Sequence, residues 1–522
     1  MPGFSAHRRA VAVWGLRPMA QTGAYTSIGR RQTMAALVGD VSALAGAVAL
    51  IAVLAFVFRM RRYGSWIRSP RHRDDRLVFR GRDEGLPLSL GPDGLNVPPG
   101  LERQGQTALM RLRLRVRPIG WLVDPFIEIQ DARGTYRQYF ERGVRGLRYL
   151  DLSPAFRAEA GPLPRRIGLR GRGLRWAPEA SLWLFAPAAV DGAGVFVLAP
   201  HPDDAEIAAF GMYENRSSWV VTVTAGEKGV ADLAPVVPTD EAARWQAFLR
   251  VQDSLTVPQL GNVPPERCVN LVYPDGRLEA MFRDPGKRNR LACEETLPRS
   301  RLRARNRLEA FQRCGPDCSW SDLVSDLRSL LARARPDIVI CPHPALEIHG
   351  DHVFATVAVA QALRDLPDQP RSVFLYAVHN QGAPTFPFGP SDALVGLPPW
   401  RREGWIAEAL YSHLLTADAR RAKYFAVEAM HDVRAHGQGA PRRPLELVRA
   451  IRREVGAYLA GLGLHPTTLL RRAPRPNEMY FVVSPEALFE LVERVLSESG
   501  CPSAPDIARR GPPIEPPEGD RS

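Results

Sequence analysis

Apolar and polar residues alternate in two different ways along this chain of 522 residues. Between residues 76 and 190, short β-rich runs are separated by Gly, Pro and Asp. The run 110–116 alternates with a period of two, which is typical of a strand with one apolar face, and its other face carries arginines. We therefore expect a small all-β sandwich over residues 76–190.

From residue 191 to about 500, apolar runs alternate with helical periods. Runs such as 194–199, 268–273 and 337–341 predict buried strands, and helical patterns follow, for example at 205–212 and 323–334. This alternation predicts an α/β fold, a Rossmann-like and mostly parallel sheet with helices on both faces.

Three further elements of this region are predicted from their end residues. A helix is expected at 240–255 with Asp240 as its cap. A last strand is expected at 477–483, and Ser484 with Pro485 is typical of a helix start.

Residues 41–58 are apolar apart from Ser42, close to the lower length limit for a membrane-spanning helix. A buried core helix and a cleaved signal peptide are the alternatives, but a cleavage site would fall inside the apolar run. Arginines are denser on the carboxyl side, so the positive-inside rule places the bulk of the chain in the cytoplasm. We expect a transmembrane anchor at 34–60, single-pass in the inner membrane, with disordered segments at 1–33 and 501–522.

The formal net charge is +13, and almost all basic residues are arginine. No helix-turn-helix, zinc-finger spacing or aromatic-basic repeat accompanies this charge, so nucleic acid is not an expected partner. The very basic stretch 283–313 interrupts the α/β rhythm, and we interpret it as an insertion. It either attracts a phosphate-bearing substrate or forms a solvated helix with Arg–Glu pairs. None of the six cysteines forms a Cys-x-x-Cys pair, so no structural zinc site is expected.

One imidazole and two carboxylates follow the predicted strand 194–199, in the turn His201-Pro202-Asp203-Asp204. Ligands and catalytic groups collect at the carboxyl ends of strands in open α/β sheets. His201 and Asp204 are three positions apart across a bend, so both can point at one metal ion. Asp203 can stay off the metal and act on a bound water. The alternative is an ordinary turn with a helix cap.

A second turn of the same kind follows the run 337–341 and contains His349, Asp351 and His352. Two strand-to-helix turns that both carry His and Asp are hard to explain as coincidental caps. A catalytic zinc ion typically takes three protein ligands and leaves one position for water.

On these two motifs, the chain resembles the PIG-L/LmbE-like family of zinc-dependent de-N-acetylases over about residues 194–483. The stretch 220–229 is similar to the second strand and the Thr-x-Gly-Glu-x-Gly loop of that family. Gly350 replaces the more usual Pro. The resemblance implies a deacetylase domain at 191–500.

The resemblance also implies roles for the residues of the two turns. His201, Asp204 and His352 would bind Zn²⁺, with Fe²⁺ as the alternative, and Asp203 would be the general base. His349 is the candidate for holding the oxyanion, with Asp351 orienting either His349 or a metal ligand. We interpret His379 as an ordinary loop histidine.

The implied reaction is removal of the acetyl group from an N-acetylated sugar of the N-acetylglucosamine type. The predicted anchor and β module favour a lipid-linked or glycan-attached substrate, with the membrane contacted through the N-terminal helix. One alternative is a catalytically silent, membrane-tethered glycan-binding or scaffold protein. Another keeps the metal and hydrolyses a different amide.

Overall fold

The computed structural model describes residues 74–501, with gaps at 82–84, 99–100, 102–106, 122–123, 132–133, 157–165, 187, 229–236, 381–385, 401–403 and 432–472. The predicted anchor at 34–60 and the segments predicted to be disordered, 1–33 and 501–522, lie outside the described residues apart from Cys501, which is described and buried. Within the described part, no helix is long and apolar enough to cross a bilayer. The described residues all belong to one compact unit, 69–522.

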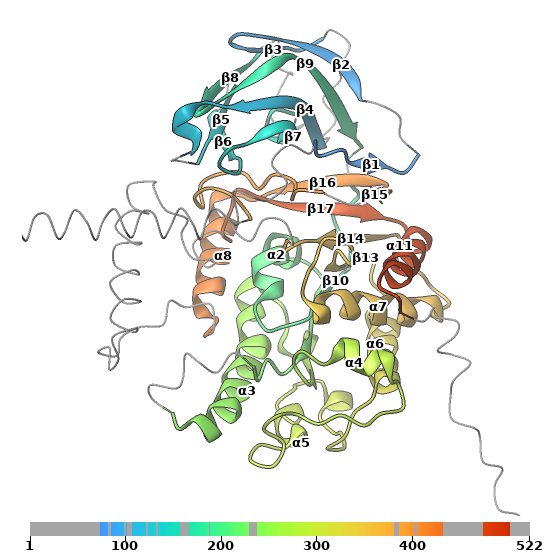
Figure 1. Cartoon of the computed structure of the whole chain (residues 1–522). Coiled ribbons are helices and arrows are strands. Elements are labelled where there is room, and N and C mark those ends of the chain that lie inside the picture. The colour runs from blue at the N-terminus through green and yellow to red at the C-terminus, as the bar shows by residue number, and fades with distance from the viewer. Residues whose placement is uncertain are drawn as a thin grey trace, which may run out of the picture. The chain divides into compact units, whose positions relative to one another are not determined.

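A seven-stranded sheet in the order β12-β11-β10-β13-β14-β17-β16 forms the centre of the α/β part (Figure 1). Its strands are β10 (Val195–Ala199), β11 (Ser218–Thr224), β12 (Cys268–Tyr273), β13 (Ile338–Pro342), β14 (Ser372–Tyr376), β16 (Ala409–Leu414) and β17 (Asn477–Val483). The first five strands of the order are parallel, and β17 is antiparallel to both of its neighbours. The predicted α/β class with a mostly parallel sheet is confirmed.

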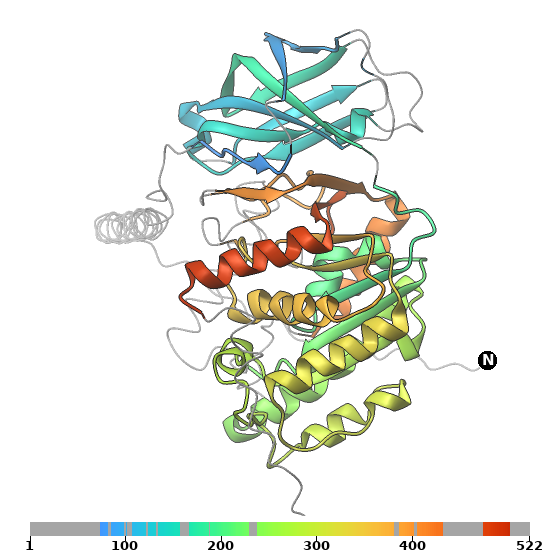
Figure 2. The same ribbon diagram turned by 90° about the vertical axis from the view of Figure 1, so that its right-hand side faces the viewer.

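Helices cover both faces of this sheet (Figure 2). One face carries α2 (Asp204–Tyr213), α3 (Thr239–Thr256) and α8 (Ala417–Ala429). The other carries α4 (Leu278–Arg283), α6 (Trp320–Ala334), α7 (Gly350–Arg364) and α11 (Pro485–Glu498). Alternate residues of β10 enter different cores, Val195 and Val197 on one side and Phe196 and Leu198 on the other. A strand buried on both faces needs a continuous apolar run, which explains the unbroken pattern in the sequence.

Helix starts differ in how well the sequence predicts them. Ser484 caps α11 as predicted, because its side chain accepts a hydrogen bond from the Ala487 amide. By contrast, α3 begins at Thr239 with Pro238 at the N-cap position, so Asp240 lies inside the first turn. The prediction of Asp240 as the cap is therefore wrong.

Two arginines of the basic insertion are buried against the edge strand β12. Arg299, in α5 (Arg299–Arg303), donates from Nε to the Val272 carbonyl at 2.8 Å and from Nη2 to the Leu271 carbonyl at 3.3 Å. Arg303 donates to the Leu271 carbonyl at 3.4 Å and pairs with Asp326 at 2.9 Å. An exposed sheet edge presents unpaired backbone groups. These two arginines cover the edge of β12 and do not belong to the solvent-exposed face of a helix.

An eight-stranded sheet in the order β6-β5-β8-β3-β2-β9-β4-β7 forms the N-terminal part of the described chain. Its strands are β2 (Leu86–Gly91), β3 (Gly94–Asn96), β4 (Thr107–Val116), β5 (Phe126–Asp131), β6 (Gly134–Tyr139), β7 (Arg145–Asp151), β8 (Arg166–Arg172) and β9 (Leu174–Phe185). Side chains from both halves of this sheet, such as Leu112 and Ile127, share one buried core. The sheet therefore folds over on itself as a sandwich. A separate parallel pair joins β1 (Val78–Phe79) to β15 (Trp405–Ala407).

A buried carboxylate connects the sandwich to the seven-stranded sheet. Asp151, at the end of β7, accepts hydrogen bonds from Ser412 Oγ at 2.6 Å and from Asn477 Nδ2 at 3.0 Å. Its other oxygen accepts the Ser153 amide at 2.8 Å. Burial raises the pKa of Asp151, although these donors oppose the shift. A buried carboxylate needs such partners, so the junction is specified by polar contacts as well as by shape.

A second buried charge fixes α8 against the sheet. The Lys423 ammonium lies 2.6 Å from Glu478 Oε1, and both side chains are 1% exposed. Glu478 also accepts the Gly211 amide at 2.9 Å and the Tyr480 hydroxyl at 2.9 Å. The pair therefore holds α8, β17 and α2 together.

We predict that Lys423→Met lowers the free energy of unfolding by about 3–5 kcal/mol, because it leaves Glu478 buried without a counter-ion. Urea denaturation of the full chain measures the change. The paired variant Lys423→Met/Glu478→Gln should lose less than the single variant, and Lys287→Met, at an exposed position, should change stability by about 0.5 kcal/mol or less. A single variant as stable as the wild type would contradict this role of the ion pair.

Candidate metal centre and active site

The two His- and Asp-containing turns meet at the point where the strand order reverses. From β10 the sheet extends to β11 and β12 on one side and to β13 and β14 on the other. The turn 201–204 follows β10, and the turn 349–352 follows its neighbour β13. The carboxyl ends of strands at such a switch point are the usual place for a ligand site in an open α/β sheet.

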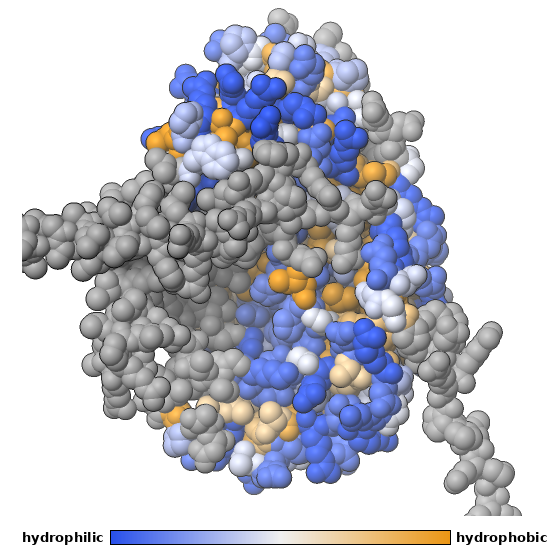
Figure 3. Space-filling model, viewed as in Figure 1, coloured by the Kyte–Doolittle hydropathy of each residue, from blue (hydrophilic) through white to orange (hydrophobic). Residues whose placement is uncertain are grey.

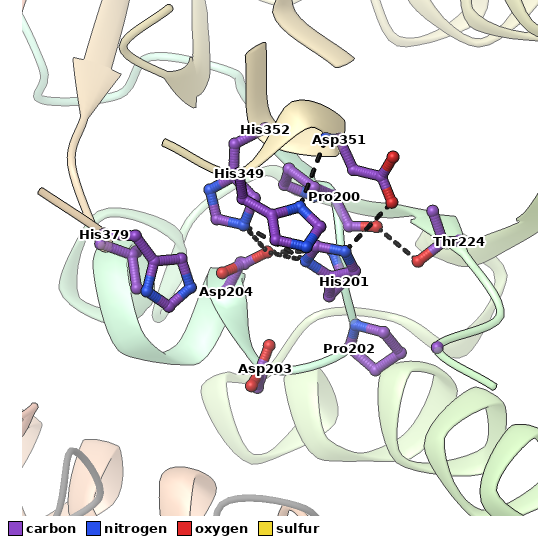
Figure 4. A network of polar contacts seen from close by, with 12 residues as sticks. Pro200, His201, Pro202, Asp203, Asp204, Thr224, His349, Asp351, His352 and His379 are labelled. Carbon is purple, nitrogen blue, oxygen red and sulfur yellow. Dashed lines mark hydrogen bonds and ion pairs between the residues drawn. The ribbon is translucent and has the colours of Figure 1, made fainter. Parts of the chain in front are cut away.

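His201, Asp204 and His352 converge on one buried point (Figure 4). Asp204 Oδ2 lies 3.4 Å from His201 Nδ1 and 3.2 Å from His352 Nε2. The two imidazole nitrogens are 3.2 Å apart. Burial alone would raise the pKa of Asp204, but the neighbouring His352 and His201 hold it well below its ordinary value.

This donor set fits a divalent cation. Two ring nitrogens and one carboxylate oxygen face the same point, and His201 and His352 are 8% and 0% exposed. Nitrogen ligands with one carboxylate suit Zn²⁺ and Fe²⁺ better than Mg²⁺ or Ca²⁺. Among the described residues, His349 and His379 each lie within 4.8 Å of two members of this set.

Asp203 stands apart from the convergent group, as Figure 4 shows. It occupies the N-cap position of α2 with φ 137°, yet its side chain makes no capping hydrogen bond. Its Oδ1 lies 3.6 Å from Arg250 Nη2, and Arg250 also donates to the Pro202 carbonyl at 3.0 Å. Backbone strain in a non-glycine residue persists only where the surroundings enforce it, commonly at functional sites. The strained turn separates the two adjacent carboxylates, so that Asp204 joins the histidines and Asp203 does not.

His349 lies at the open side of the group. Its ring is 4.7 Å from the His201 ring in an edge-on arrangement. Burial and the nearby His201 lower the pKa of His349, which favours the neutral imidazole. The Asp351 amide donates to His349 Nδ1 at 3.3 Å, so the neutral ring carries its proton on Nε2.

Asp351 contacts a candidate ligand rather than the His349 ring. Its Oδ2 lies 3.3 Å from His201 Nε2. The same carboxylate accepts the amides of Gly276 and Leu278, the latter at 3.0 Å. Asp351 therefore fixes both the His201 ring and the turn that follows β12.

His379 follows β14, and its ring is 5.1 Å from the His352 ring. Burial and the nearby His352 lower the pKa of His379. The structure thus brings this residue, interpreted from the sequence as an ordinary loop histidine, to the edge of the convergent group.

Three residues at this site were not recognised from the sequence: Asp275, Glu347 and Arg250. Asp275 Oδ1 lies 3.4 Å from His201 Nε2, and Glu347 Oε2 lies 3.3 Å from His352 Nδ1. Burial alone would raise the pKa of Asp275, but His201 lowers it to about 2. Asp275 follows the strand β12, so the rule that selected His201 could also have selected it. Arg250 has no such signal, since only the packing of α3 brings it to the turn.

Residues 196–363 match the family model described as PIG-L: GlcNAc-PI de-N-acetylase. The chain carries a PIG-L domain. The resemblance inferred from the two motifs is confirmed, and the matched range contains all six predicted site residues.

Three solved structures are similar to part of the chain. N,N'-diacetylchitobiose deacetylase from Pyrococcus horikoshii is 16% identical over 57% of this chain and 85% of its own, with a TM-score of 0.29. The zinc-inhibited form of teicoplanin deacetylase Orf2 is 15% identical over 56% and 98%, with a TM-score of 0.29. The 4-carboxy-2-hydroxymuconate hydratase GalB from Pseudomonas putida KT2440 is 13% identical over 56% and 95%, with a TM-score of 0.28. No curated protein matches the chain.

We predict that Asp351→Ala loosens the turn after β12 of the PIG-L domain, because the amides of Gly276 and Leu278 lose their acceptor. A buried amide without a partner costs about 1–3 kcal/mol. Hydrogen exchange should become faster in the peptide that covers 274–282, and less so in Asp351→Asn, which keeps one acceptor oxygen. Unchanged exchange in the alanine variant would show that Asp351 does not hold this turn.

Proposed function

We propose that this chain is a metal-dependent hydrolase that removes the acetyl group from an N-acetylated sugar of the N-acetylglucosamine type. The observation that carries the proposal is the convergence of His201, Asp204 and His352 beside an Asp203 that stays apart from them. The PIG-L domain supports the deacetylase class.

His201, Asp204 and His352 would hold Zn²⁺, with Fe²⁺ as the alternative. Such a cation, when bound, acidifies a water molecule and polarises the amide carbonyl. Asp351 and Asp275 hold the Nε2 side of His201, which leaves Nδ1 directed toward Asp204 and His352. Glu347 Oε2 lies 3.3 Å from Nδ1 of His352, on the ring nitrogen that does not face Asp204.

Asp203 is the proposed general base. Its carboxylate takes a proton from the attacking water and returns it to the departing amine. Arg250 positions the carboxylate, since its guanidinium contacts both Asp203 and the backbone of the turn.

His349 is the proposed donor to the developing oxyanion. Its Nε2–H is available because Nδ1 accepts the Asp351 amide. A neutral imidazole that donates where negative charge develops stabilises the transition state more than the ground state.

The carrier of the sugar and the location of the protein stay predictions from the sequence. A lipid-linked or glycan-attached substrate is proposed from the apolar run at 41–58 and the β module. A single-pass inner-membrane protein with a cytoplasmic catalytic part is proposed from that run and the arginines that flank it. Fractionation with protease protection would test the location.

The alternative of a catalytically silent glycan-binding or scaffold protein requires that the site no longer catalyses a reaction. A site without a reaction has no reason to keep His201, Asp203, Asp204 and His352 together in this geometry. Hydrolysis of a different amide is separated from sugar deacetylation by identifying the product.

We predict about one zinc or iron ion per full-length wild-type chain by elemental mass spectrometry, and loss of that ion in His352→Ala, because one of three ligands is removed. His431→Ala is a matched control, since His431 pairs with Asp253 outside the convergent group. A well-folded wild-type protein without metal, even after zinc is added, would favour the scaffold alternative.

We predict that Asp203→Ala keeps its metal but releases acetate from an N-acetylglucosaminide about 10²–10⁴-fold more slowly, because the proton acceptor is missing. Metal content and acetate release are measured on the same preparation. If Asp203→Ala lost metal as readily as His352→Ala, the two adjacent carboxylates would have been assigned the wrong roles.

A further inference from the structure

Three arginines from three neighbouring strands of the sandwich stand in one row. In the register of these strands, Arg115 of β4 is directly opposite Arg145 of β7 on one side and Arg175 of β9 on the other. Directly opposite residues lie on the same face of a sheet. All three side chains are exposed. We call this set the arginine row.

The other arginines on the same face of β4 have partners within the sandwich. Arg113 forms two hydrogen bonds with Asp74, at 3.1 and 3.2 Å. The Arg111 guanidinium lies 4.7 Å from the centre of the Trp183 ring. Within the part of the chain that the structure describes, no carboxylate forms an ion pair with a member of the arginine row.

The arginine row lowers the stability of the folded sandwich when no ligand is bound. Directly opposite side chains in a sheet have Cβ atoms about 5 Å apart, and like charges there repel each other. Packing does not require arginine at these positions, because all three side chains point into solvent. The β4–β9 register also shifts between Leu112 and Leu114, immediately before the row, and such bulges commonly re-aim side chains at functional sites.

An aromatic ring packs on the turn that leads into β7, the strand of Arg145. Trp121, in the 3-10 turn Pro118–Trp121 after β4, is 39% exposed. Its ring packs so closely on Gly143, two residues before Arg145, that a Cβ at Gly143 would be 2.5 Å from it. Figure 3 shows a mostly hydrophilic surface over the sandwich strands with only small apolar areas. The arginine row is cationic and exposed, and an exposed aromatic ring contacts the residue two positions before Arg145.

We propose that the arginine row binds an acidic polysaccharide whose repeating unit carries a carboxylate. Strands are about 4.8 Å apart, so the row spans roughly 10 Å and its spacing resembles the sugar repeat of an extended chain. Guanidinium groups bind carboxylates through two parallel hydrogen bonds, and an aromatic ring is a common surface for a sugar ring. Charge complementarity thus selects an acidic glycan over a neutral one.

The arginine row belongs to the same compact unit as the PIG-L domain. β7 carries Arg145 at one end and, at the other, Asp151, whose side chain bonds to β16 and β17. A polymer bound at the arginine row is thus held on the same chain as the candidate metal centre. The binding is independent of the reaction proposed for that centre.

The test measures binding of the full chain to hyaluronan and to polygalacturonate, with dextran as the neutral polymer, by affinity electrophoresis at low salt. We expect retardation by both acidic polymers and none by dextran, and weaker retardation as the salt concentration rises. The triple variant R115Q/R145Q/R175Q should bind at least tenfold more weakly. It should melt no lower than the wild type, because the substitutions remove repulsion between like charges.

The matched control is R307Q/R313Q/R333Q, which removes the same charge from exposed positions outside the sandwich. It should bind within twofold of the wild type. Equal losses in the two triple variants, or no loss in the first, would overturn the proposal. So would row-dependent binding to duplex DNA or phosphatidylglycerol vesicles without binding to the acidic polymers. Acetate release from a small N-acetylglucosaminide should persist in R115Q/R145Q/R175Q, which separates this test from that of the hydrolase.

Discussion

The structure depends on two imidazoles that face one buried carboxylate. His201 and His352 come from turns about 150 positions apart in the sequence, and Asp204 lies between their rings. The three donor atoms lie within 3.4 Å of one another, a separation that suits ligands of one cation. The parallel pairing of β10 with β13 supplies the geometry, because it brings the carboxyl ends of both strands to one place.

Carboxylates lie against the ring nitrogens of the two candidate histidine ligands that do not face Asp204. Asp351 and Asp275 contact Nε2 of His201, and Glu347 contacts Nδ1 of His352. These carboxylates also accept backbone amides, so the loops after β12, β13 and β14 are tied to the same centre. Rigid support of this kind is what a metal site needs for a defined geometry.

Buried charged side chains outside the metal centre connect secondary-structure elements and take no part in the proposed reaction. Lys423 with Glu478 connects α8 to β17, and Asp151 connects the sandwich to the seven-stranded sheet. Arg299 covers the exposed edge of β12. Each group has the partners that burial demands, which distinguishes them from the three arginines of the row on the sandwich.

The sequence by itself determined the fold class and most of the centre, because both follow from local patterns. Apolar runs and helical periods specify strands and helices, and the turns after β10 and β13 carry His201, Asp204 and His352 as sequence motifs. Only the tertiary structure decided which groups surround them. Arg250 reaches Asp203 through helix packing, and Asp351 faces His201 instead of the His349 ring, since both contacts depend on how distant elements meet. The period of β4 likewise predicted one basic face, but strand register alone placed Arg145 and Arg175 opposite Arg115. Periodicity is a property of one strand, whereas register is decided by the pairing of several strands.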